Sequence, residues 1–473
     1  MRGLLASSVG VTCALALALP LTSPALAARP VSPAAVRPAS GAEALGGTQS
    51  LPLAPLVSRD RTLAPVAEQG LPRRDVRHFS LVGVIWDDPD AVLNGRVQVR
   101  TRAVGADTWS GWQDLEIHND DAADPGTAER TSGRVHGATA PLWVGDSDGV
   151  EVRVRAEADR RTEDTARGSR TATTTAPLPA GLRLELVDPG ESAPEPTGEE
   201  SAAGAPRRAV APRPAPTADP ADADAAMDAS AANAGLVGLG ATEIPALDRQ
   251  QTEQELFALR AAELTGQQRV KPYIGPRPRI VTRHGWGADE GLRERTFVYT
   301  KKVKAAFVHH TASGNGYSCT QAASLIRGIY RYHVKSMGWR DIGYNFLVDK
   351  CGNIYEGRAG GVAKPVLGAH TLGFNSNSMG IAVLGSYGSK KPPAAATRAI
   401  AQLAAWKLGL HGANPKGKTY LKSGGGNRYP KGRKVRLNVI SGHRDGFATE
   451  CPGRQLYRKL GSTRTTAARL QGR

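Results

Sequence analysis

The chain has 473 residues, of which 40% are hydrophobic and 22% are charged, and its formal net charge is +17. This length allows about two or three domains. The charge is unevenly spread, because residues 301–473 hold 29 Lys and Arg against 5 Asp and Glu, which places +24 there and −7 on the remainder. So basic a C-terminal region favours a polyanionic partner such as nucleic acid, an anionic membrane or an acidic wall polymer, and composition alone does not choose among them.

Residues 1–28 have the features of a secretory signal peptide. A basic start at Arg2 precedes a mostly apolar stretch from Leu4 to Leu21, and the small residues 25–27 form a cleavage site. Pro20 and the shortness of the stretch argue against a stable membrane span, and no other long apolar run follows. We therefore expect an exported, soluble protein without a transmembrane segment. Export argues against nucleic acid as its partner.

The remaining chain divides by composition into a leader, a β-rich region, a linker and a mixed region. Residues 29–75 are rich in Pro, Ala and Ser and are predicted to be a disordered leader. Residues 76–187 contain short alternating strand candidates, including 79–86, 97–102 and 150–155, a pattern typical of an antiparallel β-sandwich. Residues 188–277 are a Pro/Ala-rich disordered linker with a possible short helix at 250–264.

Residues 278–473 alternate strand and helix signals. Strands are predicted at 305–309 and 379–384, a hairpin at 344–356, and helices after Thr320 and over 399–410. Such an order predicts an α/β domain, with a mixed sheet flanked by helices.

Histidine and cysteine side chains recur where this domain's strands end. His309 and His310 close one strand, and His443 lies eight positions before Cys451 in a loop that contains glycine. Imidazole nitrogen and thiolate sulfur are ligands that zinc prefers, and three of them with an open fourth position describe a catalytic site. Adjacent strand residues point to opposite faces, so only one of His309 and His310 can readily face a metal, and periodicity does not say which.

The cysteine count supports the same assignment. With Cys13 in the signal peptide, three cysteines remain in an oxidising compartment. A disulfide between Cys319 and Cys351 with Cys451 on a metal accounts for all three. The alternative is three inert buried thiols.

The region from Arg279 to about Leu460 resembles the peptidoglycan recognition protein family, in its zinc amidase branch. The matching stretches follow the order of the family and together cover about two fifths of the chain. They are Arg283–Ala288, Val308–Ala312, Gly338–Val348, Gly352–Arg358, Gly368–Thr371, Gly442–Asp445 and Cys451–Gly453.

The resemblance implies a secreted, wall-associated N-acetylmuramoyl-L-alanine amidase with one Zn²⁺ ion. It implies peptidoglycan and anionic wall polymers as partners, and we expect a monomer. It assigns His309, His443 and Cys451 to the metal. Tyr344 would contact the reaction centre and Thr449 would stabilise the oxyanion. Substrate contacts are expected from Trp339, Arg358 and His370.

The alternative function is a non-catalytic peptidoglycan-binding protein that uses the same groove. Such receptors typically lose the cysteine that this chain keeps as Cys451. Two departures from the family pattern matter as well. Ala382 stands where related enzymes carry a glutamate base, and Ala359-Gly360-Gly361 gives no basis for assigning stem-peptide specificity.

Overall fold

The computed structural model describes residues 46–56, 68–117, 120–157, 177–190 and 220–473. The predicted signal peptide, most of the predicted leader and residues 191–219 of the predicted linker lie outside the described residues. Within the described ranges, no helix combines the length and the apolar character needed to span a bilayer.

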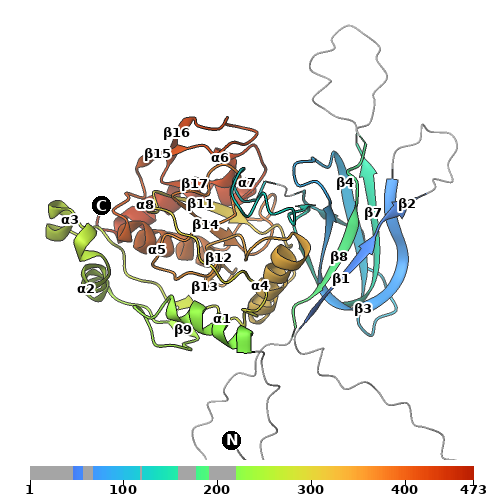
Figure 1. Cartoon of the computed structure of the whole chain (residues 1–473), viewed down its shortest axis with the longest axis horizontal. Coiled ribbons are helices and arrows are strands. Elements are labelled where there is room, and N and C mark those ends of the chain that lie inside the picture. The colour runs from blue at the N-terminus through green and yellow to red at the C-terminus, as the bar shows by residue number, and fades with distance from the viewer. Residues whose placement is uncertain (1–45, 57–67, 118–119, 158–176, 191–219) are drawn as a thin grey trace, which may run out of the picture. The chain divides into compact units, whose positions relative to one another are not determined.

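The N-terminal strands form one antiparallel sheet in the order β1-β8-β3-β7-β4-β5, with β2 and β6 paired to β3 (Figure 1). The predicted antiparallel β architecture is therefore confirmed. Alternate residues of β4 and β7 are buried, such as Val97, Val99, Val150 and Val152, and they form this sheet's own core. The strands are β1 Gly47–Pro52, β2 Ala54–Pro55, β3 Glu68–Trp86, β4 Gly95–Ala103, β5 Gln113–Leu115, β6 Gly137–Ala138, β7 Leu142–Ala156 and β8 Arg183–Asp188.

Two strands correct the prediction of a disordered leader over 29–75. β1 pairs with β8 from Gly47 opposite Asp188 to Pro52 opposite Arg183, and β3 already begins at Glu68. Most side chains in the first half of β3 are exposed or half-buried, so this segment shows no apolar alternation. Backbone pairing with neighbouring strands, which a periodicity search does not detect, holds these residues in the sheet.

The C-terminal sheet is mixed and has the order β17-β11-β14-β12-β13-β10-β9. β11 runs parallel to β14 and β17, whereas β12 and β13 form the predicted antiparallel hairpin. The predicted α/β architecture is confirmed. The strands are β9 Glu243–Ile244, β10 Ile280–Val281, β11 Ala305–His310, β12 Phe346–Val348, β13 Ile354–Glu356, β14 Ser378–Val383 and β17 Ile440–Gly442.

Helices cover both faces of this sheet (Figure 1). Ala306, Val308 and Ile381 pack with α5 and α8 in one core, whereas Leu347 and Ala382 pack with α4 in another. Strand residues that alternate between the two cores leave little room for polar side chains except where strands end. The helices and short turns are α4 Ala322–Arg331, α5 Ala394–Leu410, α6 His443–Gly446, α7 Arg454–Tyr457, α8 Leu460–Leu470, η2 Cys319–Gln321 and η3 Tyr332–Ser336.

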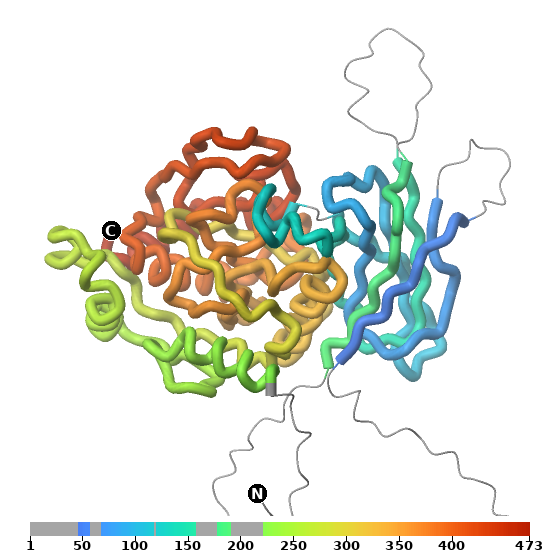
Figure 2. Tube along the Cα trace, in the orientation of Figure 1, coloured from blue at the N-terminus to red at the C-terminus, as the bar shows by residue number. Residues whose placement is uncertain are grey.

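A separate two-stranded hairpin, β15 Lys418–Lys422 with β16 Lys434–Asn438, lies at the edge of this domain in red-orange (Figure 2). Its inward residues Leu421, Val435 and Leu437 pack on Phe307 and Phe374, while its basic side chains point outward.

Secondary structure also occupies part of the predicted linker. α1 Pro220–Ala231, α2 Arg249–Arg260, η1 Ala261–Glu263 and α3 Gly266–Val270 all lie within 188–277. α2 coincides with the helix expected there, but α1 corrects the prediction of disorder. Its Ala/Asp-rich sequence has little apolar surface, and tertiary contacts order it, because Ala225 and Ala229 are buried and Arg293 Nη2 donates to Ala225 O at 2.8 Å.

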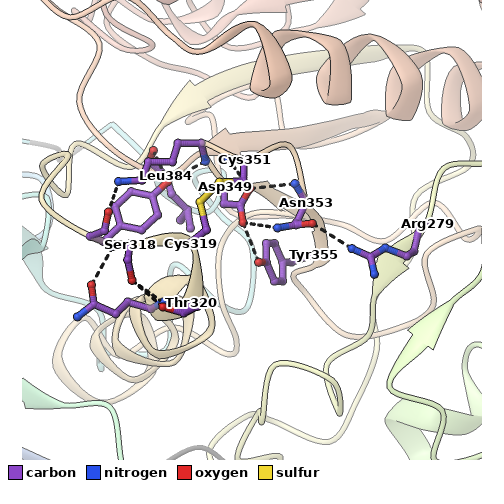
Figure 3. The surroundings of a disulfide bond; sticks show 12 residues. Arg279, Ser318, Cys319, Thr320, Asp349, Cys351, Asn353, Tyr355 and Leu384 are labelled. Atoms are coloured by element: carbon purple, nitrogen blue, oxygen red, sulfur yellow. Dashed lines mark hydrogen bonds between the residues drawn. A yellow bond between two sulfur atoms is a disulfide. The ribbon is translucent and has the colours of Figure 1, made fainter. Parts of the chain in front are cut away.

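Cys319 and Cys351 form a disulfide that joins the turn before α4 to the β12–β13 turn (Figure 3). Asp349 organises the hairpin turn beneath it. Its Oδ1 accepts from the backbone N–H groups of Cys351 and Asn353, each at 2.9 Å, and its Oδ2 accepts from Tyr355 Oη at 2.9 Å (Figure 3).

Candidate metal centre

Two adjacent parallel strands bring His309 and His443 together. β11 and β17 pair with Val308 opposite Gly442. His309 is the next residue of β11, whereas His443 follows the end of β17 and is the first residue of α6. The two rings lie 4.5 Å apart between centroids, and both side chains are fully buried. Parallel pairing therefore aligns two candidate ligands that are far apart in sequence.

The third side chain, Cys451, comes from the loop that follows α6. The N–H of Arg444 donates to Cys451 O at 3.1 Å, and the Cys451 N–H donates to Thr449 Oγ1 at 3.2 Å. These bonds fold the loop back toward the start of α6, and they bury the Cys451 thiol beside the histidines.

The ligand atoms of His309, His443 and Cys451 lie within 4.8 Å of one another, and Cys451 Sγ is 3.7 Å from His309 Nδ1. A tetrahedral zinc site keeps its N and S ligands about 3.3 to 3.6 Å apart. Neither ring nitrogen of His443 makes a hydrogen bond of ordinary geometry with the residues that the structure describes, although the ring is fully buried. A buried polar atom without such a bond is rare, so the donor set fits a metal ion.

Thr371 sets the orientation of His309. Its Oγ1 lies 3.3 Å from His309 Nε2 and 3.0 Å from His370 Nδ1, which leaves His309 Nδ1 directed at the cluster. A hydroxyl or carboxylate on the second ring nitrogen is the usual way in which a metal-binding histidine is held. Sequence reasoning missed Thr371, although it lies in the Gly368–Thr371 stretch.

His310 points away from the cluster, as alternation along a strand requires. Its Nε2 lies 3.1 Å from Glu116 Oε1, and its Nδ1 accepts from the Tyr387 N–H at 3.2 Å. His309 is thus the member of the pair that faces the cluster.

Tyr344 lies beside His309, with ring centroids 5.6 Å apart, and its hydroxyl donates to Asp121 Oδ2 at 2.5 Å. Burial, and then the negative charge of Asp121, raise the pKa of Tyr344 well above its ordinary value of 10.0. The phenol therefore stays protonated, which suits it to donate a hydrogen bond and not to act as a base.

Asp121 is a member of the cluster that the sequence did not reveal. Its Oδ1 lies 3.1 Å from His309 Nδ1 and 3.1 Å from His443 Nδ1. Burial lowers the pKa of His443, but Asp121 and Cys451 outweigh burial and raise it to about 10. The only signal in the sequence is the pair Asp120-Asp121 between two strands, and acidic pairs are common on protein surfaces.

The three residues predicted to contact substrate are buried in this structure, with His370 0%, Trp339 2% and Arg358 8% exposed. Trp339 packs against His333, with ring centroids 4.5 Å apart. Arg358 donates from both terminal nitrogens to Glu129, at 2.9 and 2.8 Å. Their roles toward substrate stay predictions.

Thr449 lines a cleft of about 900 Å³, whose lining does not include His309, His443 or Cys451. The cleft also has Asn427, Arg428 and Arg444 in its wall, together with Glu116 and Asp120 from the N-terminal part of the chain. The Thr449 hydroxyl accepts from the Cys451 N–H at 3.2 Å. Its role in catalysis stays a prediction.

Comparison with known proteins shows the family of this chain. The profile of N-acetylmuramoyl-L-alanine amidases matches residues 299–454, and a profile described as "Rv3811 N-terminal galactose-binding domain-like" matches residues 34–178. Peptidoglycan-recognition protein SC2 of Drosophila simulans is 35% identical over 183 residues, which span 38% of this chain and 84% of that relative. The chain belongs to the peptidoglycan recognition protein family.

Two further proteins similar to this member of the peptidoglycan recognition protein family differ in the share of their own length that the match covers. The N-acetylmuramoyl-L-alanine amidase of Homo sapiens is 36% identical over 156 residues, which span 33% of this chain and 26% of that protein. The solved structure of Drosophila PGRP-LB matches with 26% identity and a TM-score of 0.31, over 39% of this chain and 92% of that chain.

The Arg283–Ala288 stretch, which resembles the peptidoglycan recognition protein family, has a structural role in this member. Arg283 is 2% exposed, and it donates to Glu290 Oε1 at 2.7 Å and to Asp341 Oδ1 at 3.1 Å. Trp286 Nε1 donates to Glu356 O at 2.7 Å. The Arg283–Ala288 stretch therefore ties the start of the domain to the hairpin strand β13.

Proposed function

We propose that this chain is a zinc-dependent N-acetylmuramoyl-L-alanine amidase, which hydrolyses the amide between N-acetylmuramic acid and L-alanine of the peptidoglycan stem. The observation that carries the proposal is the convergence of His309 Nδ1, His443 and Cys451 Sγ in one buried cluster. The amidase profile over 299–454 and the name of the human relative support the same reaction. When bound, zinc supplies a Lewis acid for the scissile carbonyl and activates water.

Residues around the cluster have separable tasks in this reaction. Thr371 holds His309 in the orientation that its Nδ1 needs, and Tyr344 donates a hydrogen bond to the oxygen on which negative charge develops. Thr449 places a second hydroxyl group, in addition to that of Tyr344, close to Cys451. Ala382 lies directly opposite His309 in the sheet and offers no base, so removal of the proton from the attacking water depends on solvent, with Tyr344 and Thr449 as hydrogen-bond partners.

We further propose export and action at the cell wall. The signal-peptide pattern of residues 1–28 and the disulfide suit an oxidising compartment, and we assign the amidase domain to residues 278–473. Eight basic side chains on and around the β15–β16 hairpin are exposed, which suits contact with anionic wall polymers. They are Lys416, Lys418, Lys422, Arg428, Lys431, Arg433, Lys434 and Arg436.

Digestion of purified walls followed by mass spectrometry tests the proposal. We expect free stem peptides beginning with L-alanine, and loss of both zinc and cleavage in His309→Gln and Cys451→Ala. The matched control is His310→Gln, which changes the neighbouring histidine on the opposite face and should keep the zinc. Binding of glycan strands with zinc present but without release of stem peptides would favour a non-catalytic peptidoglycan-binding protein.

A further inference from the structure

A segment of the N-terminal sheet domain covers the metal centre. Residues 120–129 follow β5, and Asp120, Asp121, Ala122 and Ala123 are 3 to 6% exposed. The backbone N–H of Leu372 donates to Asp120 O at 3.1 Å, and Asn375 Nδ2 donates to Ala122 O at 2.8 Å. We call residues 120–129 the covering segment.

We propose that Asp121 is a fourth ligand of the metal and that the covering segment thereby closes the site. This inference rests on the proposed zinc centre. It adds a ligand from outside the amidase domain, in the position that a catalytic zinc leaves open to water.

The geometry of Asp121 matches that of a ligand. Asp121 Oδ1 lies 3.1 Å from the Nδ1 atoms of both His309 and His443, close to the spacing of about 3.3 Å between the N and O ligands of a tetrahedral zinc. Asp120 lies further away, with Oδ2 3.8 Å from His443 Nδ1. Carboxylate oxygen is an accepted zinc ligand, and His443 has a fully buried ring whose nitrogens make no ordinary hydrogen bond with the described residues.

The second oxygen of Asp121 occupies the other half of the reaction centre. Asp121 Oδ2 accepts the Tyr344 hydroxyl at 2.5 Å, so the proton that would stabilise an oxyanion is already engaged. One carboxylate thus takes both the open metal position and the phenol. A substrate carbonyl needs the same two partners, so it can enter only after Asp121 has left.

Two carboxylates anchor the covering segment at its far end. Asp124 Oδ1 accepts from the Gly373 N–H at 2.8 Å and from Asn375 Nδ2 at 2.7 Å. Glu129 binds both terminal nitrogens of Arg358, and both side chains are buried. Because Arg358 is also a predicted substrate contact, the segment lies across the surface that peptidoglycan would need.

Binding of a small metal ligand to the full-length chain tests the inference without using amidase activity. The protein is loaded with Co²⁺ in place of zinc, and azide is added while the visible absorption of the metal is followed. We expect azide to bind Asp121→Ala at least about tenfold more tightly than the wild type, since a site that is open for a tenth of the time loses that factor in apparent affinity. Asp121→Asn keeps the shape of the side chain and should behave like Asp121→Ala.

Asp124→Ala provides a second test, because it weakens the anchor without touching the metal. It should also tighten azide binding, while Asp107→Ala, an exposed aspartate of the same domain, should leave it unchanged. Equal azide affinity in the wild type, Asp121→Ala and Asp124→Ala would overturn the inference. If the wild type bound no metal, or if His309→Gln still bound it, the proposed zinc centre itself would fail instead.

Discussion

Thr371 shows how a single hydroxyl can determine which nitrogen of a histidine is available. It lies between His309 Nε2 and His370 Nδ1, and His370 is itself held neutral because burial, and then the neighbouring His309, lower its pKa well below 6.5. The neutral His370 ring packs edge-on against His309 with centroids 5.2 Å apart. His309 therefore has one orientation, with Nδ1 toward the cluster.

Thr371→Val should weaken zinc binding by about ten- to a hundredfold, because it removes the hydrogen-bond partner of His309 while keeping the shape of the side chain. Competition with a chromophoric chelator measures the change. Thr371→Ser, which keeps the hydroxyl, is the matched control and should bind zinc nearly as the wild type does. An unchanged affinity in the valine variant would show that packing alone orients His309.

Glu356 is a fully buried carboxyl that leads to a pH-dependence of stability. Burial raises its pKa from 4.5 to about 7, against the opposing effect of hydrogen bonds from Asn233 Nδ2, which are 3.0 Å long to both carboxyl oxygens. The folded protein therefore binds more protons than the unfolded chain between these two pH values. The contribution of Glu356 to the unfolding free energy falls as the pH rises through this range.

Glu356→Gln should remove this pH-dependent fall in the unfolding free energy, which amounts to about 3 kcal/mol between pH 4.5 and 7. Urea unfolding gives the unfolding free energy of the variant and of the wild type at pH 5 and at pH 8. The change between the two pH values should be smaller in the variant than in the wild type. Glu157→Gln, at an exposed position, is the control and should follow the wild type at both pH values. A parallel pH response of Glu356→Gln and the wild type would contradict the prediction.

At the scale of elements, the site depends on the ends of neighbouring strands and on the turns between them. β11 and β17 align two histidines, and β12 with β13 forms the hairpin whose turn carries Cys351. The disulfide connects this turn to Cys319 at the turn before α4, across a sequence separation of 32. It therefore links the helix on one face of the sheet to a strand pair within it.

Replacing both Cys319 and Cys351 by Ala should lower the unfolding free energy by about 3 to 4 kcal/mol, chiefly because the unfolded chain is no longer constrained. Urea unfolding measures this change. Zinc content should be unaffected, since Cys451 is not part of the bridge. Loss of zinc from the folded double variant would show instead that the disulfide positions the metal ligands.

At the scale of the whole molecule, positive charge is concentrated on and around the β15–β16 hairpin, which carries none of the proposed metal ligands His309, His443 and Cys451. The β15–β16 hairpin turns its apolar residues inward and its Lys and Arg outward, and residues 411–440 contain no Asp or Glu. Such a surface attracts polyanions over a distance that shrinks as salt is added. In the proposed function, the hairpin would assist binding to a wall without taking part in hydrolysis.

Lys434→Gln combined with Arg436→Gln should weaken binding to anionic wall polymer by about threefold to tenfold at low salt, and the difference should vanish at high salt. Sedimentation with purified walls measures the bound fraction. The control pair, Lys390→Gln with Lys391→Gln, removes the same charge from another exposed site. Equal losses in both pairs would mean that total charge matters and that the hairpin has no special part.

Much of the architecture and part of the site could be predicted from local patterns. Alternating residues in β4 and β7 depend on neighbours within a few positions, as do the pair His309-His310 and the spacing of His443 and Cys451, and a sequence displays such patterns directly. The choice of His309 over His310 needed the resemblance to the family. The leader and linker predictions failed at β1 and α1 because backbone pairing and distant packing order these elements. The side chains of β1 and α1 have too little apolar surface to give a periodic hydrophobic pattern.

The sequence by itself determined the groups available to this protein: histidines and a cysteine of the kind that zinc prefers, and a basic C-terminal surface. The resemblance to the family then chose His309 over His310 and added Tyr344. Only the tertiary structure decided which residues of the N-terminal sheet domain lie against these groups. Asp121 meets Tyr344 across 223 positions of sequence, and Glu129 meets Arg358 across 229. A periodic pattern in the sequence cannot predict contacts at such separations, because they form only when the N-terminal sheet domain packs against the amidase domain.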